Sequence, residues 1–158
     1  MNIAHTDVAY EVSINPATLE EIGRLPMTTP EGFTEAFEQA RQAQKAWAEL
    51  SYKQRARYIL KMADYIRDHA DELADIISRD NGKLKIDAMT TEVLPSVMSC
   101  TWYAKNAPKV LKDKLLMPPS LLFFNKWSKR IYQPIGTLGI ISPWNYPFSI
   151  PFGEIVMA

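Results

Sequence analysis

A short turn near the carboxyl end of the chain places an amide side chain between two aromatic residues and two prolines, in the order Pro143-Trp144-Asn145-Tyr146-Pro147. An uncharged amide held rigidly in this way can donate a hydrogen bond to an oxygen that gains negative charge during a reaction. Proline and asparagine also favour ordinary turns, and aromatic side chains often fasten loops to a core. The turn is therefore a candidate site, with a structural turn as the alternative interpretation.

The residues on either side of the turn predict how it is held. The apolar run Ile135 to Ile141 is typical of a short strand buried on both faces of a parallel sheet. Open α/β sheets place ligand sites at the carboxyl ends of such strands. Gly136 and Gly139 lie inside this run, so they do not form a phosphate loop between a strand and a helix. Residues Phe148 to Ala158 predict a following helix, with Pro151 near its first turn.

Upstream, the chain predicts a strand, a turn and a second strand before the first helix. Apolar residues alternate from Val8 to Ile14, Asn15 to Thr18 supply turn residues, and Glu21 to Leu25 resume an extended pattern. Thr29-Pro30 then carries the capping hydroxyl and first-turn proline of a helix. Aromatic residues along this helix, among them Phe33, Phe37 and Trp47, are interpreted as core residues.

Three further helices follow, with short connections. Ser51 and Gln54 fit a capping box at the start of the second helix, and Asn81-Gly82 supplies a left-handed stop after the third. Apolar residues from Ile86 to Ala104 line a fourth helix, in which Pro95 is expected to cause a kink or a break because it removes a backbone donor. The basic side chains on these helices are interpreted as solvated helix exteriors: Arg41, Arg55, Arg57 and Lys61.

Beyond the fourth helix, the sequence predicts an antiparallel hairpin. Its strands are expected at Leu121 to Phe124 and at Trp127 to Tyr132, joined by a turn at Asn125-Lys126.

Composition excludes several classes of protein. The 158 residues carry 18 basic and 18 acidic side chains, so no excess charge is available for a nucleic-acid or anionic lipid partner. No apolar run reaches the roughly 18 residues of a membrane span. The single cysteine, Cys100, and the absence of a secretory signal indicate a cytoplasmic protein. Two distant histidines, His5 and His69, do not indicate a metal site.

Several motifs in this order resemble the aldehyde dehydrogenases, NAD(P)-dependent enzymes that oxidise aldehydes through a cysteine thiohemiacetal. The resemblance covers nearly the whole chain and corresponds to the N-terminal portion of the family. It rests on the following motifs: Asn15-Pro16-Ala17-Thr18, Trp47, Arg55 with Leu60, Glu72-Leu73-Ala74, Gly82-Lys83, Glu92-Val93, Pro134-Ile135-Gly136 and Pro143-Trp144-Asn145-Tyr146-Pro147.

The resemblance implies a truncated α/β fold. Residues 1–114 would form the N-terminal strands and helices of the cofactor-binding domain, and residues 115–133 a hairpin that resembles the family's oligomerisation segment. Residues 134–158 would contain the first strand of a Rossmann-type parallel sheet, the turn and the start of the next helix.

The resemblance also implies roles for individual residues. Asn145 matches the asparagine of the family's oxyanion hole and is the one catalytic candidate. Tyr146 matches an aromatic residue near the aldehyde tunnel. Four residues match the segment that passes beside the dinucleotide: Ile141, Ser142, Pro143 and Trp144.

Other catalytic groups of the family have no match in this chain. The family's nucleophilic cysteine, its general-base glutamate and its ribose-binding lysine all lie downstream of the turn. Cys100 falls on an apolar helical stripe, so it is interpreted as packing and not as a nucleophile. Glu154 is interpreted as a solvated or capping carboxylate.

Two functional hypotheses follow, beside a third interpretation as a helical binding domain unrelated to dehydrogenases, which would require the strand from Ile135 to Ile141 to be absent. The first is the N-terminal part of an aldehyde dehydrogenase that forms a homo-oligomer and, when intact, oxidises a small aldehyde with NAD or NADP. This chain alone is expected to be inactive and to bind no cofactor. The second is a non-catalytic assembly or interaction module, whose exposed sheet edges would pair with another chain.

Overall fold

A computed structural model describes residues 9–118 and 120–158 and begins with a β-hairpin. Strands β1 (Tyr10–Ile14) and β2 (Glu21–Pro26) pair antiparallel. Asn15 shapes the connecting turn, because its Oδ1 accepts a hydrogen bond from the Ala17 amide at 2.9 Å. The predicted strand, turn and strand are therefore confirmed from residue 10 onward, and residues 1–8 lie outside the described part.

Three helices follow where the capping signals predict them. They are α1 (Pro30–Glu49), α2 (Tyr52–Asp68) and α3 (Ala70–Asn81). The Ser51 hydroxyl accepts from the Gln54 amide, and the Gln54 side chain accepts from the Ser51 amide, so the capping box is confirmed. After α3, Gly82 adopts the predicted left-handed conformation with φ 77°.

The fourth helix contains a change of winding immediately before Pro95. It comprises α4 (Lys85–Ala88), the π-helical turn η1 (Met89–Val93) and α5 (Leu94–Val110). The expected interruption is thus a π-helical turn, and the chain stays helical through Pro95. Such wide turns relieve local hydrogen-bond conflicts and frequently occur at functional sites.

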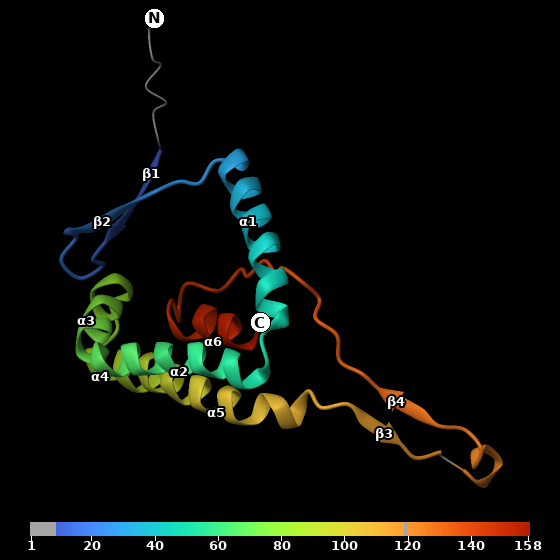
Figure 1. The fold of residues 1–158 in the computed structure, drawn as a ribbon. Coiled ribbons are helices and arrows are strands. Elements are labelled where there is room, and N and C mark those ends of the chain that lie inside the picture. Colours follow the sequence, from blue (N-terminus) through green and yellow to red (C-terminus); the bar gives the residue numbers. More distant parts are fainter. Residues whose placement is uncertain (1–8, 119) are drawn as a thin grey trace, which may run out of the picture.

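The core lies where α2, α5 and the last helix, α6 (Ser149–Met157), pack together (Figure 1). Ala63, Cys100 and Val156 form one buried cluster of this core. A second cluster lies nearer α3 and includes Ile66, Ala74, Ile77, Ala88 and Val93. The interpretation of Cys100 as a packing residue is confirmed.

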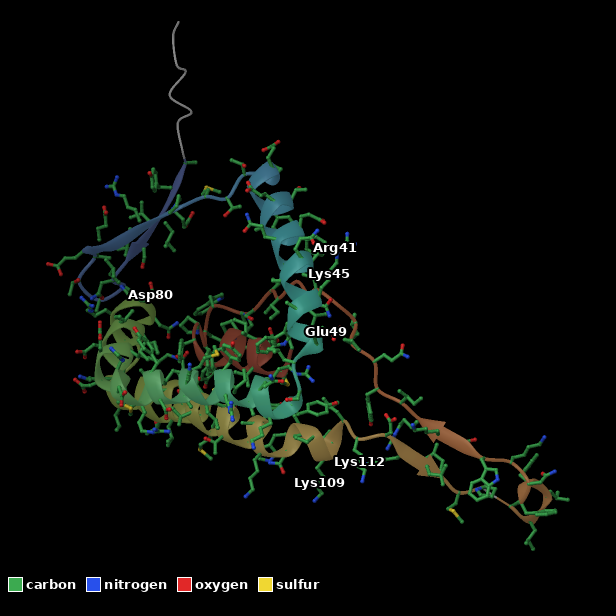
Figure 2. All side chains as sticks on the ribbon, in the orientation of Figure 1. Arg41, Lys45, Glu49, Asp80, Lys109 and Lys112 are labelled. Atoms are coloured by element: carbon green, nitrogen blue, oxygen red, sulfur yellow. The ribbon has the colours of Figure 1, made fainter. Side chains whose placement is uncertain are left out.

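Helix α1 contributes no buried residue, so the predicted core role of its first aromatic residues is wrong. Phe33 and Phe37 are exposed, because no described element covers this stripe of the helix. Trp47 is half-buried and meets the Tyr58 ring edge-on, with ring centroids 5.6 Å apart. Figure 2 shows the charged residues Arg41, Lys45 and Glu49 along the same helix.

The hairpin differs from its prediction in the position of its first strand. Strand β3 (Lys114–Leu116) pairs antiparallel with β4 (Ser128–Arg130), and the segment Leu121–Phe123 forms a 3₁₀ turn, η2. The first strand precedes the proline at position 118, which lacks a donor for a continued ladder. Figure 1 shows the hairpin projecting from the helices as an arm.

The predicted strand from Ile135 to Ile141 is not formed. In the described part of the chain this segment pairs with no strand, and the Ile135 and Ile141 side chains are exposed. A parallel strand is stable only beside neighbouring strands and beneath covering helices. The described residues supply no neighbouring strand, and only the end of α6 lies near the run, so its apolar side chains are at most partly covered.

Candidate functional site

The turn that contains Asn145 joins this unpaired segment to helix α6, which begins at Ser149. Asn145 is exposed at the surface of this turn. Its backbone carbonyl is held by Lys83, whereas its side-chain amide has no hydrogen-bond partner among residues 9–118 and 120–158. The amide is therefore available to a group outside the chain.

Two side chains, one from the last residue of α3 and one just after that helix, hold the backbone of the turn. The Asn81 amide nitrogen donates to the Trp144 carbonyl at 3.2 Å, and Lys83 Nζ donates to the Asn145 carbonyl at 3.0 Å. Lys83 Nζ also lies 4.5 Å from the centroid of the Tyr146 ring, within cation–π range. Three consecutive residues of the turn are thus in contact with residues more than sixty positions earlier in the sequence.

Glu92 holds the far end of the same turn from inside the protein. Its side chain is 0% exposed and is paired with Lys83. Its Oε2 accepts hydrogen bonds from the backbone amides of Phe148 at 2.8 Å and Ser149 at 3.2 Å. These amides belong to the first turn of α6, where backbone donors lack helical partners and negative charge is favourable.

Local structure brings Lys83 and Glu92 together. Gly82 reverses the chain after α3, and the Ser78 hydroxyl donates to the Lys83 carbonyl at 2.7 Å, which fixes the start of the connection. Glu92 lies in the π-helical turn, and the buried Ser96 hydroxyl donates to the Glu92 carbonyl at 2.7 Å. Both ends of this short connection are therefore rigid.

The residues predicted to line a dinucleotide lie together in one surface segment. Ile141 is 100% exposed and Trp144 is 82% exposed. The Ser142 hydroxyl donates to Glu154 Oε2 at 3.1 Å, and Pro143 is exposed. Glu154 thus acts as a local acceptor on α6. Tyr146 lies against Lys83 and remains 37% exposed.

Cys100 lies apart from this turn. Burial among α2, α5 and α6 raises the pKa of its thiol, which disfavours the reactive thiolate. His69 Nδ1 lies 2.9 Å from the Tyr65 carbonyl oxygen, and its ring stacks on Tyr65. Within the described ranges, no group of three or more metal-binding side chains is placed to hold an ion. No helix in those ranges is both long and apolar enough to cross a membrane.

The sequence pattern did not predict that Asn81, Lys83 and Glu92 contact the turn or one another. A signal for Glu92 was present in the spacing. Glu92, Ser96 and Cys100 follow one another at intervals of four and share one helix face, and all three are buried. A carboxylate on a buried face requires a partner, which Lys83 supplies.

Comparison with known proteins identifies the family. The model of the aldehyde dehydrogenase family matches residues 4–158. Succinate semialdehyde dehydrogenase [NAD(P)+] Sad of Escherichia coli is 32% identical over 142 residues, which are 90% of this chain and 29% of that protein.

Two solved structures share the arrangement of helices and strands. Methylmalonate-semialdehyde dehydrogenase from Oceanimonas doudoroffii is 25% identical, with a TM-score of 0.80 over 92% of this chain and 29% of that one. Succinic semialdehyde dehydrogenase from Streptococcus pyogenes, in complex with NADP+, is 26% identical, with a TM-score of 0.75 over 91% of this chain and 30% of that one. The chain spans less than a third of the length of these relatives. The chain belongs to the aldehyde dehydrogenase family.

Proposed function

We propose that this chain supplies the oxyanion donor of an NAD(P)-dependent aldehyde dehydrogenase that oxidises an aldehyde to a carboxylic acid. The observation that carries this proposal is the Asn145 amide, which has no hydrogen-bond partner within the described residues. It lies on a turn whose backbone is held at Trp144, Asn145 and Phe148. A donor that is already oriented stabilises developing negative charge without reorganisation. The attacking thiolate and the general base would come from a segment outside residues 1–158.

The segment before Asn145 suits the adenosine portion of a dinucleotide but not its diphosphate. Ile141 and Trp144 present uncovered apolar surface, which suits the adenosine portion of NAD or NADP. No basic residue lies between positions 135 and 146 to neutralise a diphosphate. Bound NAD or NADP would accept a hydride from the aldehyde carbon. We therefore propose that the chain forms one wall of the cofactor site in the intact enzyme and that it binds no dinucleotide by itself.

The test joins this chain to the part of the Escherichia coli relative that follows its matched region, and measures aldehyde-dependent NAD(P)H formation. In this chimaeric enzyme, Asn145→Ala is expected to lower kcat by about 100-fold to 1,000-fold, because one oxyanion donor is lost. Asn106→Ala is the matched control, since the Asn106 amide bonds only to the Trp102 carbonyl of its own helix. Unchanged kcat in Asn145→Ala would refute the proposal, as would turnover by the 158-residue chain alone.

A second candidate function is assembly through the arm that contains β3 and β4. Its tip exposes large apolar side chains, including Leu121 at 89% and Leu122 at 86%. Exposed apolar surface of this kind marks interaction sites. We propose that the arm pairs two copies of the chain, as in a homo-oligomer.

Light scattering at increasing concentration tests this candidate. The chain is expected to self-associate, and Leu122→Asp is expected to weaken the dimer at least about tenfold, because a charge would be desolvated in the interface. Leu19→Asp serves as the control, because Leu19 is 79% exposed in the β1–β2 turn, away from the arm. A monomer at every concentration would count against assembly.

A further inference from the structure

We propose that Glu92 and Lys83 are positioning residues for Asn145: together they set the backbone of the turn from which the amide is presented. This inference rests on the proposed function for the role of Asn145. The anchoring itself rests on contacts alone. Both side chains are largely withdrawn from solvent, since Glu92 is 0% exposed and the Lys83 side chain is 14% exposed.

The pair contacts the backbone at Asn145 and again just after the turn. Lys83 binds the carbonyl oxygen of Asn145 itself, and Glu92 binds the amides of Phe148 and Ser149. The backbone is thus fixed at Asn145 and again three and four residues later. Hydrogen bonds with one charged partner are the strong ones, and each of these bonds has one. Among residues 9–118 and 120–158, nothing bonds to the side chain of Asn145, as a donor to an outside group requires.

The opposite charges of Glu92 and Lys83 make the position of each side chain depend on the other. A carboxylate withdrawn from water is costly unless it is paired and fully hydrogen-bonded. Glu92 meets this condition through one ammonium group and two backbone amides. Lys83 in turn is oriented by Glu92, so its contacts with the Asn145 carbonyl and the Tyr146 ring depend on the carboxylate. Loss of either charge is expected to release the turn.

A purely structural role would give a different pattern of contacts. Packing of α2 against α5 involves neither side chain, and the buried clusters contain only apolar residues and Cys100. The contacts of Glu92 and Lys83 join the end of α3, the π-helical turn and the start of α6. Changes to the pair are therefore expected to alter the turn more than the helices that form the core.

Amide hydrogen exchange of the 158-residue chain, resolved by NMR, tests the proposal. In Glu92→Gln, exchange at Phe148 and Ser149 is expected to be about 10-fold to 100-fold faster, because hydrogen bonds to a charged acceptor are lost. The side-chain amide signals of Asn145 should move, whereas those of Asn106 should not. Lys85→Met is the matched control: Lys85 pairs with Asp71 and Asp75 at the surface and has no bond to the turn.

The double variant Lys83→Met with Glu92→Gln covers the case in which Glu92→Gln alone does not fold. It removes both charges together, which avoids leaving one of them buried without a partner. Native helical circular dichroism with fast exchange at Phe148 and Ser149 supports the proposal. Exchange as slow as in the unmodified chain would overturn it. Global unfolding of the double variant would also overturn it, because the pair would then hold the fold and not the turn.

Failure of this inference and failure of the proposed function can be distinguished. Exchange is measured without catalysis, so it reports on anchoring even if Asn145→Ala leaves the chimaeric enzyme fully active. Conversely, slow exchange in the double variant would refute the anchoring of the turn by Glu92 and Lys83. The oxyanion role of Asn145 would still be tested separately by Asn145→Ala.

Discussion

At the scale of single residues, the side-chain amide of Asn145 and the thiol of Cys100 differ in their exposure to solvent. Asn145 is exposed and its amide has no hydrogen-bond partner within the described ranges, whereas Cys100 is buried at 0% exposure. The apolar helical stripe predicted the burial of Cys100, whereas the role of Asn145 as an oxyanion donor stays a prediction. Contacts over sixty positions, such as Lys83 to Asn145, could not be predicted from local pattern.

The buried thiol of Cys100 is expected to make the free energy of unfolding depend on pH in the alkaline range. Burial raises the pKa of Cys100 in the folded chain, so its contribution to stability is fully present below the unfolded pKa of about 8.5 and is lost as pH rises above it. Urea unfolding between about pH 7 and pH 9.5 should show a smaller loss of stability in Cys100→Ala than in the unmodified chain. An identical loss in the two proteins would show that Cys100 does not titrate differently on folding.

At the scale of elements, capping residues predicted the helix ends well because their bonds are local. Ser51, Gln54 and Gly82 take the predicted conformations. Elements that depend on distant partners were predicted less well. The run from Ile135 to Ile141 has the composition of a buried strand and no paired neighbour in the described part of the chain. The first strand of the arm was misplaced because pairing selected residues 114–116 over the more apolar run beyond position 120.

Gly82 ends α3 and lies against the turn between β1 and β2. Its φ of 77° disfavours any residue with a Cβ, and a Cβ would lie 2.7 Å from Pro16 Cγ in the β1–β2 turn. Figure 2 shows Asp80 at the end of α3 beside this turn, where Asp80 accepts a hydrogen bond from Ser13. Gly82→Ala is expected to lower the free energy of unfolding by about 1 to 3 kcal/mol in urea titrations.

Gly23→Ala is the control for that change, because a Cβ at Gly23 meets no atom within 4 Å. Its effect should stay within about 0.5 kcal/mol. Equal stability of the two alanine variants would contradict the strain assigned to Gly82.

At the scale of the whole molecule, exposed apolar surface is as informative as the core. The first turns of α1, the segment 135–141 and the arm all expose large apolar side chains, including Phe33, Ile141 and Leu122. Each is a surface on which another chain or another segment is expected to pack. The chain spans less than a third of the length of the relatives that it matches.

The most direct measurement is a double-mutant cycle on kcat of the chimaeric enzyme, with Asn145→Ala, Glu92→Gln and the two combined. If Glu92 acts through the placement of Asn145, the combined variant will be no slower than Asn145→Ala alone, because the amide that Glu92 positions is already gone. Glu92→Gln alone should lower kcat more than it raises KM. Losses that multiply in the combined variant would contradict the claim that the buried pair works by presenting Asn145.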